Sequence, residues 1–497
     1  MKQITTLLLF IFCSSLGYAQ TVNIQGNPYG GNPYVTIQAA VDASTNPSDV
    51  ILITGVHTES VTIQKSLTLR GTDPTIDIIQ AAAAPASDGT GTRVLSLDEG
   101  NFNISVENLG IRHGNISDNG GGIFVDKVTG SVTLSNLIIE NNYCTNNGGG
   151  IGLAGTVATI IGCTIQNNTS TQDGGAILAA PNNASNLNSV IDIEQSLIDS
   201  NTGRNGGAIY INGNPNFGND WLIDVNITNT TVSNNTATSA SGGNGGGAIF
   251  SASRPWTVNN TIGNITLKLV HATFYGNSHA ALNKSGIQFG SAAVTNFSIY
   301  NSIVVYTDDI ATKAINFANS NTTDVVNSIL GGLNAAPTAI IDDVAKNNEK
   351  GRTATFAGIT TGLTDQGGDT LVFAIDGNST ADDFCTATTG ITLPSVDQRG
   401  YSREGVVDAG AFEFGGTLGT SDRTLTQIKV FPNPSSNVVY ITGINNIESV
   451  KIYSMLGQLQ KEVYSLSTIP VSDLSAGTYL MRIESNGTKT TKRLLIN

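Results

Sequence analysis

One short pattern of apolar and polar positions recurs eight times between residues 103 and 331, as in VENLGI, LSNLII and ITNTTV. Each copy has a branched apolar residue, a turn-forming residue two positions later and a second apolar residue three positions after that. The turn-forming position holds Asn108, Asn136, Gly162, Gln195, Asn229, His271, Asn301 and Asn327. Because Asn and Gly enter the left-handed region of φ at the lowest cost, the pattern predicts two strands joined by a sharp corner.

The spacing of these corner residues predicts a solenoid. They stand 26 to 42 residues apart, which leaves room for the long crossover that parallel strands need. One strand–corner–strand unit cannot bury its apolar face alone, whereas stacked copies form continuous ladders. The sequence therefore predicts an all-β chain, built as a right-handed parallel β-helix with regular coils over residues 103–331.

Residues 20–102 are expected to form the N-terminal cap and the first coils. Thr36 is a candidate N-cap for a short helix with Ile37, Ala40 and Val41 on one face. Such a helix would protect the open end of the first coil, and strands are predicted at Val50–Ile53, Val61–Ile63 and Leu67–Leu69. The stretch from Thr36 to Gly71 resembles the N-terminal part of the pectin-lyase-like superfamily, which includes lyases, esterases, hydrolases and non-enzymatic adhesins.

A second phrase recurs between the corners: GGGIF from Gly120, GGGIG from Gly148, GGAIL from Gly174, GGAIY from Gly206 and GGAIF from Gly246. It is similar to the repeat of polymorphic outer-membrane proteins and related bacterial surface β-helices. Glycine-rich loops can also hold phosphates, but this phrase lacks the P-loop lysine and a following helix. The resemblance therefore supports the solenoid and not a nucleotide site.

Irregular spacing indicates where a binding surface could lie. Insertions in solenoids emerge as loops, often on the binding face. Both tryptophans, Trp221 and Trp256, fall in such extra segments, and each follows a strand that carries Tyr210 or Phe250. These four aromatic residues are the candidate ligand-binding set, because flat rings on adjacent coils can stack on sugars. The alternative is that the tryptophans pack the insertions onto the coils.

Residues 332–416 are expected to end the β-helix, with a final strand around Val372, Phe373 and Ile375. The segment ends in SVDQRGYSREGVVDAGAFEF, which resembles the end of the choice-of-anchor Q domain. That family consists of secreted β-helical proteins fastened to the surface by differing C-terminal anchors. We expect this stretch to close the last coil, with the charged residues Asp397, Arg399, Asp408 and Glu413 satisfying one another and that coil's backbone.

Residues 417–424 have the composition of a linker, and residues 425–497 form about seven short alternating strands, which predicts a small β-sandwich. This region resembles the type A sorting domain of the type IX secretion system. Its motif residues are Pro432, Asn433, Pro434, Gly457, Gly477, Tyr479 and Lys492. The resemblance implies that residues 425–497 engage the secretion machinery, and that the chain reaches the outer-membrane surface or the extracellular space.

Composition and charge fit an exported protein. Residues 1–19 have the form of a secretory signal, with Lys2 ahead of the apolar run Leu7–Phe12, and no later stretch is apolar for long enough to span a membrane. The net charge of −14 and the absence of Lys/Arg clusters argue against nucleic-acid binding. We expect a monomer.

Cys163 is interpreted as a core residue, with a Cys144–Cys163 disulfide as the alternative.

No spacing typical of a catalytic triad or a metal site stands out, so no catalytic residue, cofactor or metal ligand is assigned. Glu140, Gln166, Asp199 and Ser233 form a predicted outward polar row. The favoured function is a non-catalytic, glycan-binding or adhesin-like surface protein with polysaccharide as partner. The alternative is a lyase or hydrolase of acidic polysaccharide that uses Asp199, Asp224 or Arg204, with Ca²⁺ held by acidic oxygens.

Overall fold

The structure is a computed structural model. It describes residues 20–26, 33–182, 187–213, 222–239, 245–252, 264–280, 286–290, 295–309, 311–417, 429–431, 435, 437–442, 447–454, 458–464, 468–485 and 488–496. The chain divides into two compact units, Met1–Gly416 and Thr417–Asn497. The predicted signal segment and predicted linker residues 418–424 lie outside the described residues.

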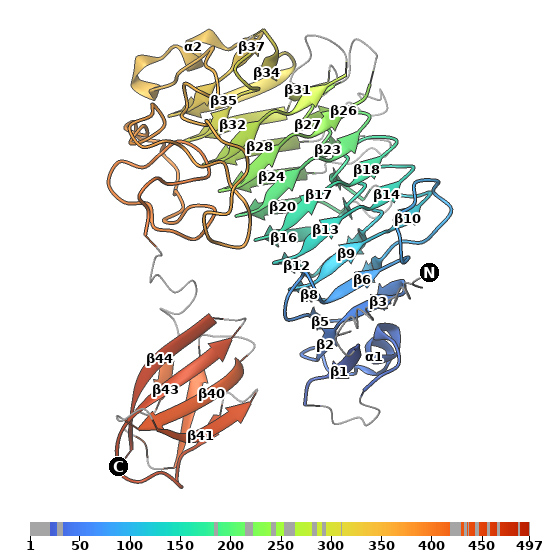
Figure 1. The fold of residues 1–497 in the computed structure, drawn as a ribbon, viewed down its shortest axis with the longest axis vertical. Coiled ribbons are helices and arrows are strands. Elements are labelled where there is room, and N and C mark those ends of the chain that lie inside the picture. Colours follow the sequence, from blue (N-terminus) through green and yellow to red (C-terminus); the bar gives the residue numbers. More distant parts are fainter. Residues whose placement is uncertain are drawn as a thin grey trace, which may run out of the picture. The chain divides into compact units, whose positions relative to one another are not determined.

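The first unit is a parallel β-helix, in which successive coils stack from the N-terminal end toward β37 (Figure 1). The strand before each corner belongs to a sheet that we call sheet A. Its strands are, in order, β1 (Thr21–Ile24), β2 (Val50–Thr54), β5 (Leu67–Arg70), β8 (Ile104–Glu107), β12 (Ser131–Ser135), β16 (Val157–Ile161), β20 (Ser189–Glu194), β24 (Leu222–Thr228), β28 (Asn264–Val270), β32 (Thr295–Tyr300) and β35 (Ser320–Val326). Only the β1–β2 pair of this sheet is antiparallel.

The strand after each corner belongs to sheet B. Its strands are β3 (Val56–Thr58), β6 (Ile78–Gln80), β9 (Gly110–Arg112), β13 (Ile138–Glu140), β17 (Thr164–Gln166), β21 (Leu197–Asp199), β25 (Thr231–Ser233), β29 (Thr273–Tyr275), β33 (Ile303–Val304) and β36 (Ile329–Leu330). Two-residue strands follow in six coils and form sheet D: β10 (Asn115–Ile116), β14 (Tyr143–Cys144), β18 (Thr169–Ser170), β22 (Thr202–Gly203), β26 (Thr236–Ala237) and β30 (Ser278–His279).

The strand that begins at the isoleucine of the GGAI phrase belongs to sheet C. Its strands are β4 (Val61–Ile63), β7 (Leu95–Gly100), β11 (Ile123–Val128), β15 (Ile151–Ala154), β19 (Ile177–Ala180), β23 (Ile209–Asn212), β27 (Ile249–Ala252), β31 (Ile287–Phe289), β34 (Lys313–Asn316) and β37 (Gly332–Asn334). Within each coil the chain runs through sheets A, B and C and then returns to sheet A one coil further along.

The eight predicted corners have the backbone that the sequence pattern predicts. Every one has a positive φ, between 45° at Asn229 and 63° at Gly162. The apolar residues on either side are paired in register from coil to coil, as in Leu134 with Ile160 and Ile139 with Ile165. Asn136 Nδ2 also donates to Asn108 Oδ1 at 2.6 Å. The stacked corners and the continuous ladders beside them are therefore confirmed.

A second column, at the turn between sheets B and D, consists of buried asparagines: Asn142, Asn168, Asn201, Asn235 and Asn277. The backbone N–H of each of the first four donates to Oδ1 of the asparagine one coil further along, for example Asn168 to Asn201 at 2.9 Å. The Asn168 amide also donates to the carbonyl of Ile139 at 2.9 Å. These side chains supply the partners that a buried, turning backbone would otherwise lack.

Short helices cover both ends of the tube. In α1 (Ile37–Ala43) the Thr36 hydroxyl accepts from the Ala39 N–H at 3.1 Å, and the predicted face of Ile37, Ala40 and Val41 is buried. At the other end α2 (Thr338–Ile341) buries Ile341 in the same core and is followed by a 3₁₀ turn, η1 (Val344–Lys346). The predicted short helix, its N-cap and its buried face are therefore confirmed, and α2 is the helix that packs at the last coil.

Residues 364–413, which we call the lateral segment, do not close the last coil as predicted. They lie along the corner column of the middle coils (Figure 1, orange), where Gln195 Nε2 donates to the Asp397 carbonyl at 3.0 Å. Val372, Phe373 and Ile375 form no strand and instead pack in an apolar cluster with Ile303 and Ile329. The physical reason is that the corners of the middle coils present polar groups that this segment satisfies.

Three successive coils have long connections between sheets C and A. In regular coils this connection is as short as residues 129–130 or 155–156. In three successive coils it grows to residues 181–188, 213–221 and 253–263. We call this edge the insertion corner.

The three cysteines in the described part of the chain are unpaired. Cys144 and Cys163 are both buried free thiols, and Cys385 is a half-buried one. Cys163 lies in the main apolar core, as predicted. The alternative of a Cys144–Cys163 disulfide is therefore wrong. The two residues belong to different faces of the coil, since Cys144 is on sheet D and Cys163 directly follows the Gly162 corner.

The second unit has seven antiparallel strands among its described residues. One sheet contains β38 (Lys429–Phe431), β39 (Val438–Thr442) and β42 (Thr468–Pro470), and the other contains β41 (Leu459–Tyr464), β40 (Ile447–Ser454), β43 (Gly477–Ser485) and β44 (Thr488–Ile496). Their apolar residues form one core cluster, to which Tyr479 contributes while donating its hydroxyl to the Ser475 carbonyl at 2.8 Å. Among the described residues of the chain, no helix is long and apolar enough to cross a membrane.

Candidate functional site

The outward side of sheet C carries the best-placed aromatic residues. Tyr210 and Phe250 are register partners on β23 and β27, at positions that alternate with core isoleucines. Their ring centroids are 6.0 Å apart and their planes differ by 9°, so the rings stack from one coil to the next. Tyr210 is half-buried, whereas Phe250 is only 3% exposed.

The four predicted aromatic residues therefore differ in availability. Phe250 is buried, so the expectation that its ring offers a free face to a ligand is wrong. Its role is to support Tyr210 from the neighbouring coil. Trp221 and Trp256 lie outside the described residues. Of the predicted set, Tyr210 is the described residue that can present part of its ring.

The aromatic pair lies next to the insertion corner. Strands β23 and β27 end at Asn212 and Ala252, only two residues after Tyr210 and Phe250, and the insertions 213–221 and 253–263 follow directly. The Tyr210 hydroxyl lies 3.4 Å from Asn212 Oδ1. A polar amide and a partly exposed ring are thus held together at the base of the two longest insertions.

The predicted polar row on sheet B exists and runs along successive coils. Glu140, Gln166, Asp199 and Ser233 are register partners, and Gln166 Nε2 donates to Glu140 Oε2 at 2.9 Å. Asp199 Oδ1 accepts from the Ser233 hydroxyl, and its Oδ2 accepts from the Ser200 hydroxyl at 2.6 Å. These side chains satisfy one another, which is the behaviour of a structural ladder.

The outward side of sheet A carries a second polar group. Asp192, Asn226 and Lys268 are register partners on β20, β24 and β28, and Asn226 Nδ2 donates to Asp192 Oδ1 at 3.0 Å. Asp224 lies two residues before Asn226 on the same side of the strand. Burial raises the pKa of Asp224 above its ordinary value, and the nearby Asp192 also raises it, while Lys268 acts in the opposite direction.

The three residues proposed for a lyase do not come together. Asp224 lies on sheet A and Asp199 on sheet B, which are different faces of the coil separated by the Asn229 corner. Arg204 follows sheet D and its Nε donates to Asp173 Oδ1 at 3.1 Å. A lyase site would therefore use one of these three residues without the other two. Among the described residues, no three His, Cys, Asp or Glu side chains are grouped so as to hold a metal ion.

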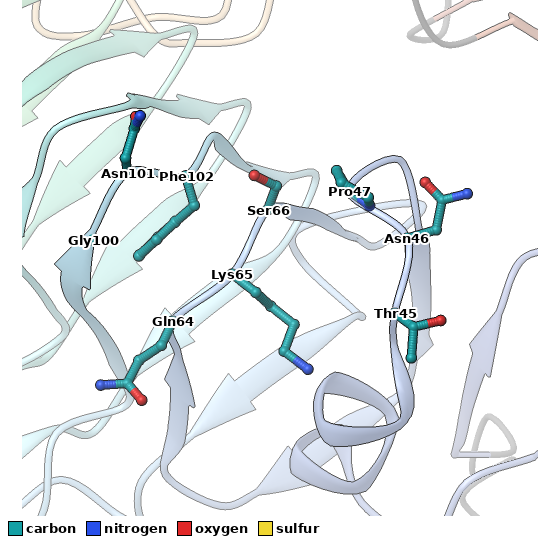
Figure 2. A pocket seen from close by; sticks show the side chains of 9 residues that line it. All are labelled: Thr45, Asn46, Pro47, Gln64, Lys65, Ser66, Gly100, Asn101 and Phe102. Atoms are coloured by element: carbon teal, nitrogen blue, oxygen red, sulfur yellow. The ribbon is translucent and has the colours of Figure 1, made fainter.

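A pocket of about 250 Å³ lies near the first coils, between the loop after α1 and the turns at residues 64–66 and 100–102 (Figure 2). Its one charged side chain is Lys65. The Lys65 ammonium donates to the carbonyls of Val41 and Ser44, both at 3.0 Å. Those carbonyls lie at the C-terminal end of α1, where a positive charge is favourable. Lys65 therefore fixes the N-terminal cap, and the pocket carries no reactive group.

The charged residues of the lateral segment form buried ion pairs. Arg399 pairs with Asp397 at 2.7 Å, and Arg403 pairs with Glu413 at 2.8 Å. Burial raises the pKa of Asp408 to about 6, although the N–H groups of Phe414 and Asp383 favour its charged form. Asp397 and Arg399 satisfy one another as predicted, but the group faces the middle coils. Arg403, which the sequence interpretation left out, lies at its centre.

Comparison with known proteins identifies the second unit and part of the solenoid. Residues 429–497 match the family described as Secretion system C-terminal sorting domain. Residues 162–180, from the Gly162 corner to the end of β19, match the Chlamydia polymorphic membrane protein repeat. No curated protein matches the chain.

A solved structure with some likeness is the tailspike protein gp49 from Acinetobacter baumannii bacteriophage Fri1, a capsular polysaccharide depolymerase. It is 12% identical, the alignment covers 92% of this chain and 75% of that chain, and the TM-score is 0.26. A TM-score this low supports no argument about fold or activity. The stacked sheets and the match over residues 429–497 together show an exported parallel β-helix protein, directed to the cell surface or the extracellular space by a type IX secretion sorting domain.

Proposed function

We propose that the solenoid is a non-catalytic passenger that binds glycans at the cell surface or outside the cell. The observation that carries this proposal is the stacked Tyr210–Phe250 pair at the base of the insertion corner. Binding residues are often placed on loops held by a rigid scaffold. Here the scaffold is the stack of coils, and the supported aromatic ring lies two residues before the end of β23, after which the insertion 213–221 begins.

The chemistry of the pair suits a sugar. A sugar ring has apolar faces and polar edges, so an aromatic ring can cover one face while amide groups bond the hydroxyls. Phe250 holds the Tyr210 ring parallel to its own at 6.0 Å, which fixes its orientation before a ligand arrives. Asn212, two residues further along the same strand, supplies an amide on the same side. A ring fixed in advance loses little entropy when it binds.

A glycan array tests this proposal. The intact, folded chain should bind a subset of immobilised polysaccharides, and heat-unfolded chain should not. Equal signal from the folded and unfolded chains, or no signal on any glycan, would contradict it. The array should include neutral and acidic polysaccharides, because the net charge of −14 disfavours acidic glycans at low salt.

A second candidate function, cleavage of an acidic polysaccharide, is favoured by one observation on sheet A. Asp192 and Asp224 lie on adjacent strands near Lys268, and Asp224 has a raised pKa, as a general acid requires. Ca²⁺ enters only under this alternative. Incubating the chain with uronic-acid polysaccharides and measuring unsaturated or reducing ends tests it. Product that disappears in Asp224→Asn but persists in Asp199→Asn would favour cleavage over binding alone.

A further inference from the structure

The lateral segment contacts a series of successive corners. Gln195 Nε2 donates to the Asp397 carbonyl at 3.0 Å, and Asn229 Nδ2 donates to the Val396 carbonyl at 2.7 Å. Further along, the Asn301 carbonyl accepts from the Gly410 N–H at 2.8 Å. Similar contacts join Asn327 Nδ2 to the Ala387 carbonyl at 2.8 Å and Thr273 Oγ1 to the Ala411 N–H at 2.9 Å. The segment is therefore fixed to five consecutive coils.

Buried charges hold the segment in this position. The side chain of Arg403 is 1% exposed and that of its partner Glu413 is 5% exposed. Arg403 Nη2 also donates to Asn229 Oδ1 at 3.1 Å and to the Gly410 carbonyl at 2.9 Å. Removing one member would leave a buried charge and several polar groups without partners. Arg403 thus couples the folding of the segment to its attachment on the Asn229 corner.

The chain leaves the first unit immediately after these contacts. The Glu413 N–H donates to Asp397 Oδ2 at 3.1 Å, and the unit ends at Gly416. A tether that continues from Gly416 is consequently attached to the side of the middle coils. The last coil, with β36, β37 and α2, pairs on one side only, with the coil before it, and the lateral segment contacts it at Asn327.

We propose that the lateral segment transmits tension from the C-terminal tether into the middle coils and so protects the last coil from being peeled away. Each coil of a solenoid is held only by its neighbours, so tension applied at an end coil breaks one interface at a time. Tension applied through the lateral segment must break the contacts with five coils together. Those coils include the ones that carry the insertions 213–221 and 253–263.

The functional meaning rests on the proposed function, because tension arises only if the displayed solenoid holds a ligand. The mechanical claim itself needs no ligand, so it can fail or succeed separately. Optical tweezers on the full chain provide the test, with one handle at Val157→Cys, which is 48% exposed on β16, and the other at residue 497. The native thiols of Cys144 and Cys163 are buried and do not compete for the handle, and the half-buried Cys385 is replaced by Ser in every chain tested.

In the unaltered chain, residues 350–416 should come free only together with the loss of the middle coils. In Arg403→Met, those residues should come free first, as a step of roughly 220–240 Å, followed by steps of single coils. The rate of this first release at equal tension should rise at least about 100-fold, as expected for breaking a buried pair. The matched control is Arg352→Met, which removes a pair with Glu349 whose arginine is 41% exposed, and it should behave like the unaltered chain.

Thr231→Val provides a second variant should Arg403→Met fail to fold. It keeps the side-chain volume and removes only the hydrogen bond to Gln398 Oε1 at 2.6 Å, so release of residues 350–416 should again come earlier. Early release of residues 350–416 in the unaltered chain, at the same tension as in Arg403→Met, would overturn the proposal. Identical traces for Thr231→Val and the unaltered chain would also overturn it.

Discussion

Arg403 and Asn229 are joined by a hydrogen bond of 3.1 Å between Nη2 and Oδ1, although they lie 174 positions apart in the chain. This contact places a buried arginine of the lateral segment on a corner of the solenoid. The two parts of the first unit are therefore energetically coupled, and several consequences of that coupling can be measured.

Replacing Arg403 should destabilise the solenoid strongly. Arg403→Met leaves Glu413 buried and unpaired, which typically costs about 3–5 kcal/mol. Arg403→Met combined with Glu413→Leu should lose less than the sum of the single changes, by about 1–3 kcal/mol. Tryptophan fluorescence during urea unfolding measures the unfolding free energy of the first unit. The chain has two tryptophans, Trp221 and Trp256, and both belong to that unit. Strict additivity would show that the two residues are not coupled.

The buried asparagine column should be sensitive to single changes. Asn168 accepts from the Asn142 N–H at 3.1 Å and donates to the Ile139 carbonyl at 2.9 Å. Asn168→Ala removes both of these bonds and leaves the Asn142 N–H without its side-chain acceptor, so we expect a loss of about 2–4 kcal/mol. Faster hydrogen exchange of the β13 and β17 amides would report this loss of stability. The exposed Asn321→Ala is the control and should change stability by less than about 0.5 kcal/mol; a comparable loss there would undermine the interpretation.

The corner column should tolerate glycine and reject β-branched residues. Asn136 has φ of 50°, where a β-branched side chain clashes with the backbone. Asn136→Val should therefore cost about 2 kcal/mol or more, whereas Asn136→Gly keeps the backbone and should cost less than about 1 kcal/mol. Exchange of the β12 and β16 amides distinguishes the two variants. Equal losses would mean that the side-chain hydrogen bond to Asn108, and not the backbone, determines this position.

His271 should make the solenoid less stable in acid. Burial, reinforced by the charge of Arg403, lowers the pKa of His271 well below 6.5. The folded state keeps the ring neutral while the unfolded chain binds a proton, so this stability is present above pH 6.5 and is lost as pH falls below it. The loss should therefore grow as the pH is lowered from 6.5 toward 5.

The control for this pH dependence is His271→Asn, which restores the commonest residue of the corner column. Asp408, whose pKa burial raises to about 6, acts in the opposite direction but is present in both proteins. The difference in unfolding free energy between the two proteins therefore isolates His271. This difference should be constant above pH 7. As the pH falls to 5, the unaltered chain should lose stability relative to His271→Asn. A difference that does not change with pH would mean that the ring is protonated in the folded state.

The repeat determined how much of the fold could be predicted. Each corner, such as Asn136 or Gly162, has its two apolar neighbours at the same offsets in the sequence, so local preference and stacking agree. The lateral segment could not be predicted in the same way. Its contacts, such as Thr231 with Gln398, join residues 167 positions apart without any repeating pattern. The burial of Phe250 was also unpredictable, because it depends on what packs over the outward face of the strand.

The binding of a glycan at Tyr210 is the claim on which the functional account depends. The most direct test is the dissociation constant of the intact chain for the best glycan of the array, measured with Tyr210→Ala and with Tyr143→Ala. Tyr143 is a half-buried tyrosine on sheet D and serves as the matched control. We expect Tyr210→Ala to weaken binding at least about tenfold and Tyr143→Ala to leave it unchanged. Unaltered affinity in Tyr210→Ala, or an equal loss in both variants, would contradict a binding site on sheet C.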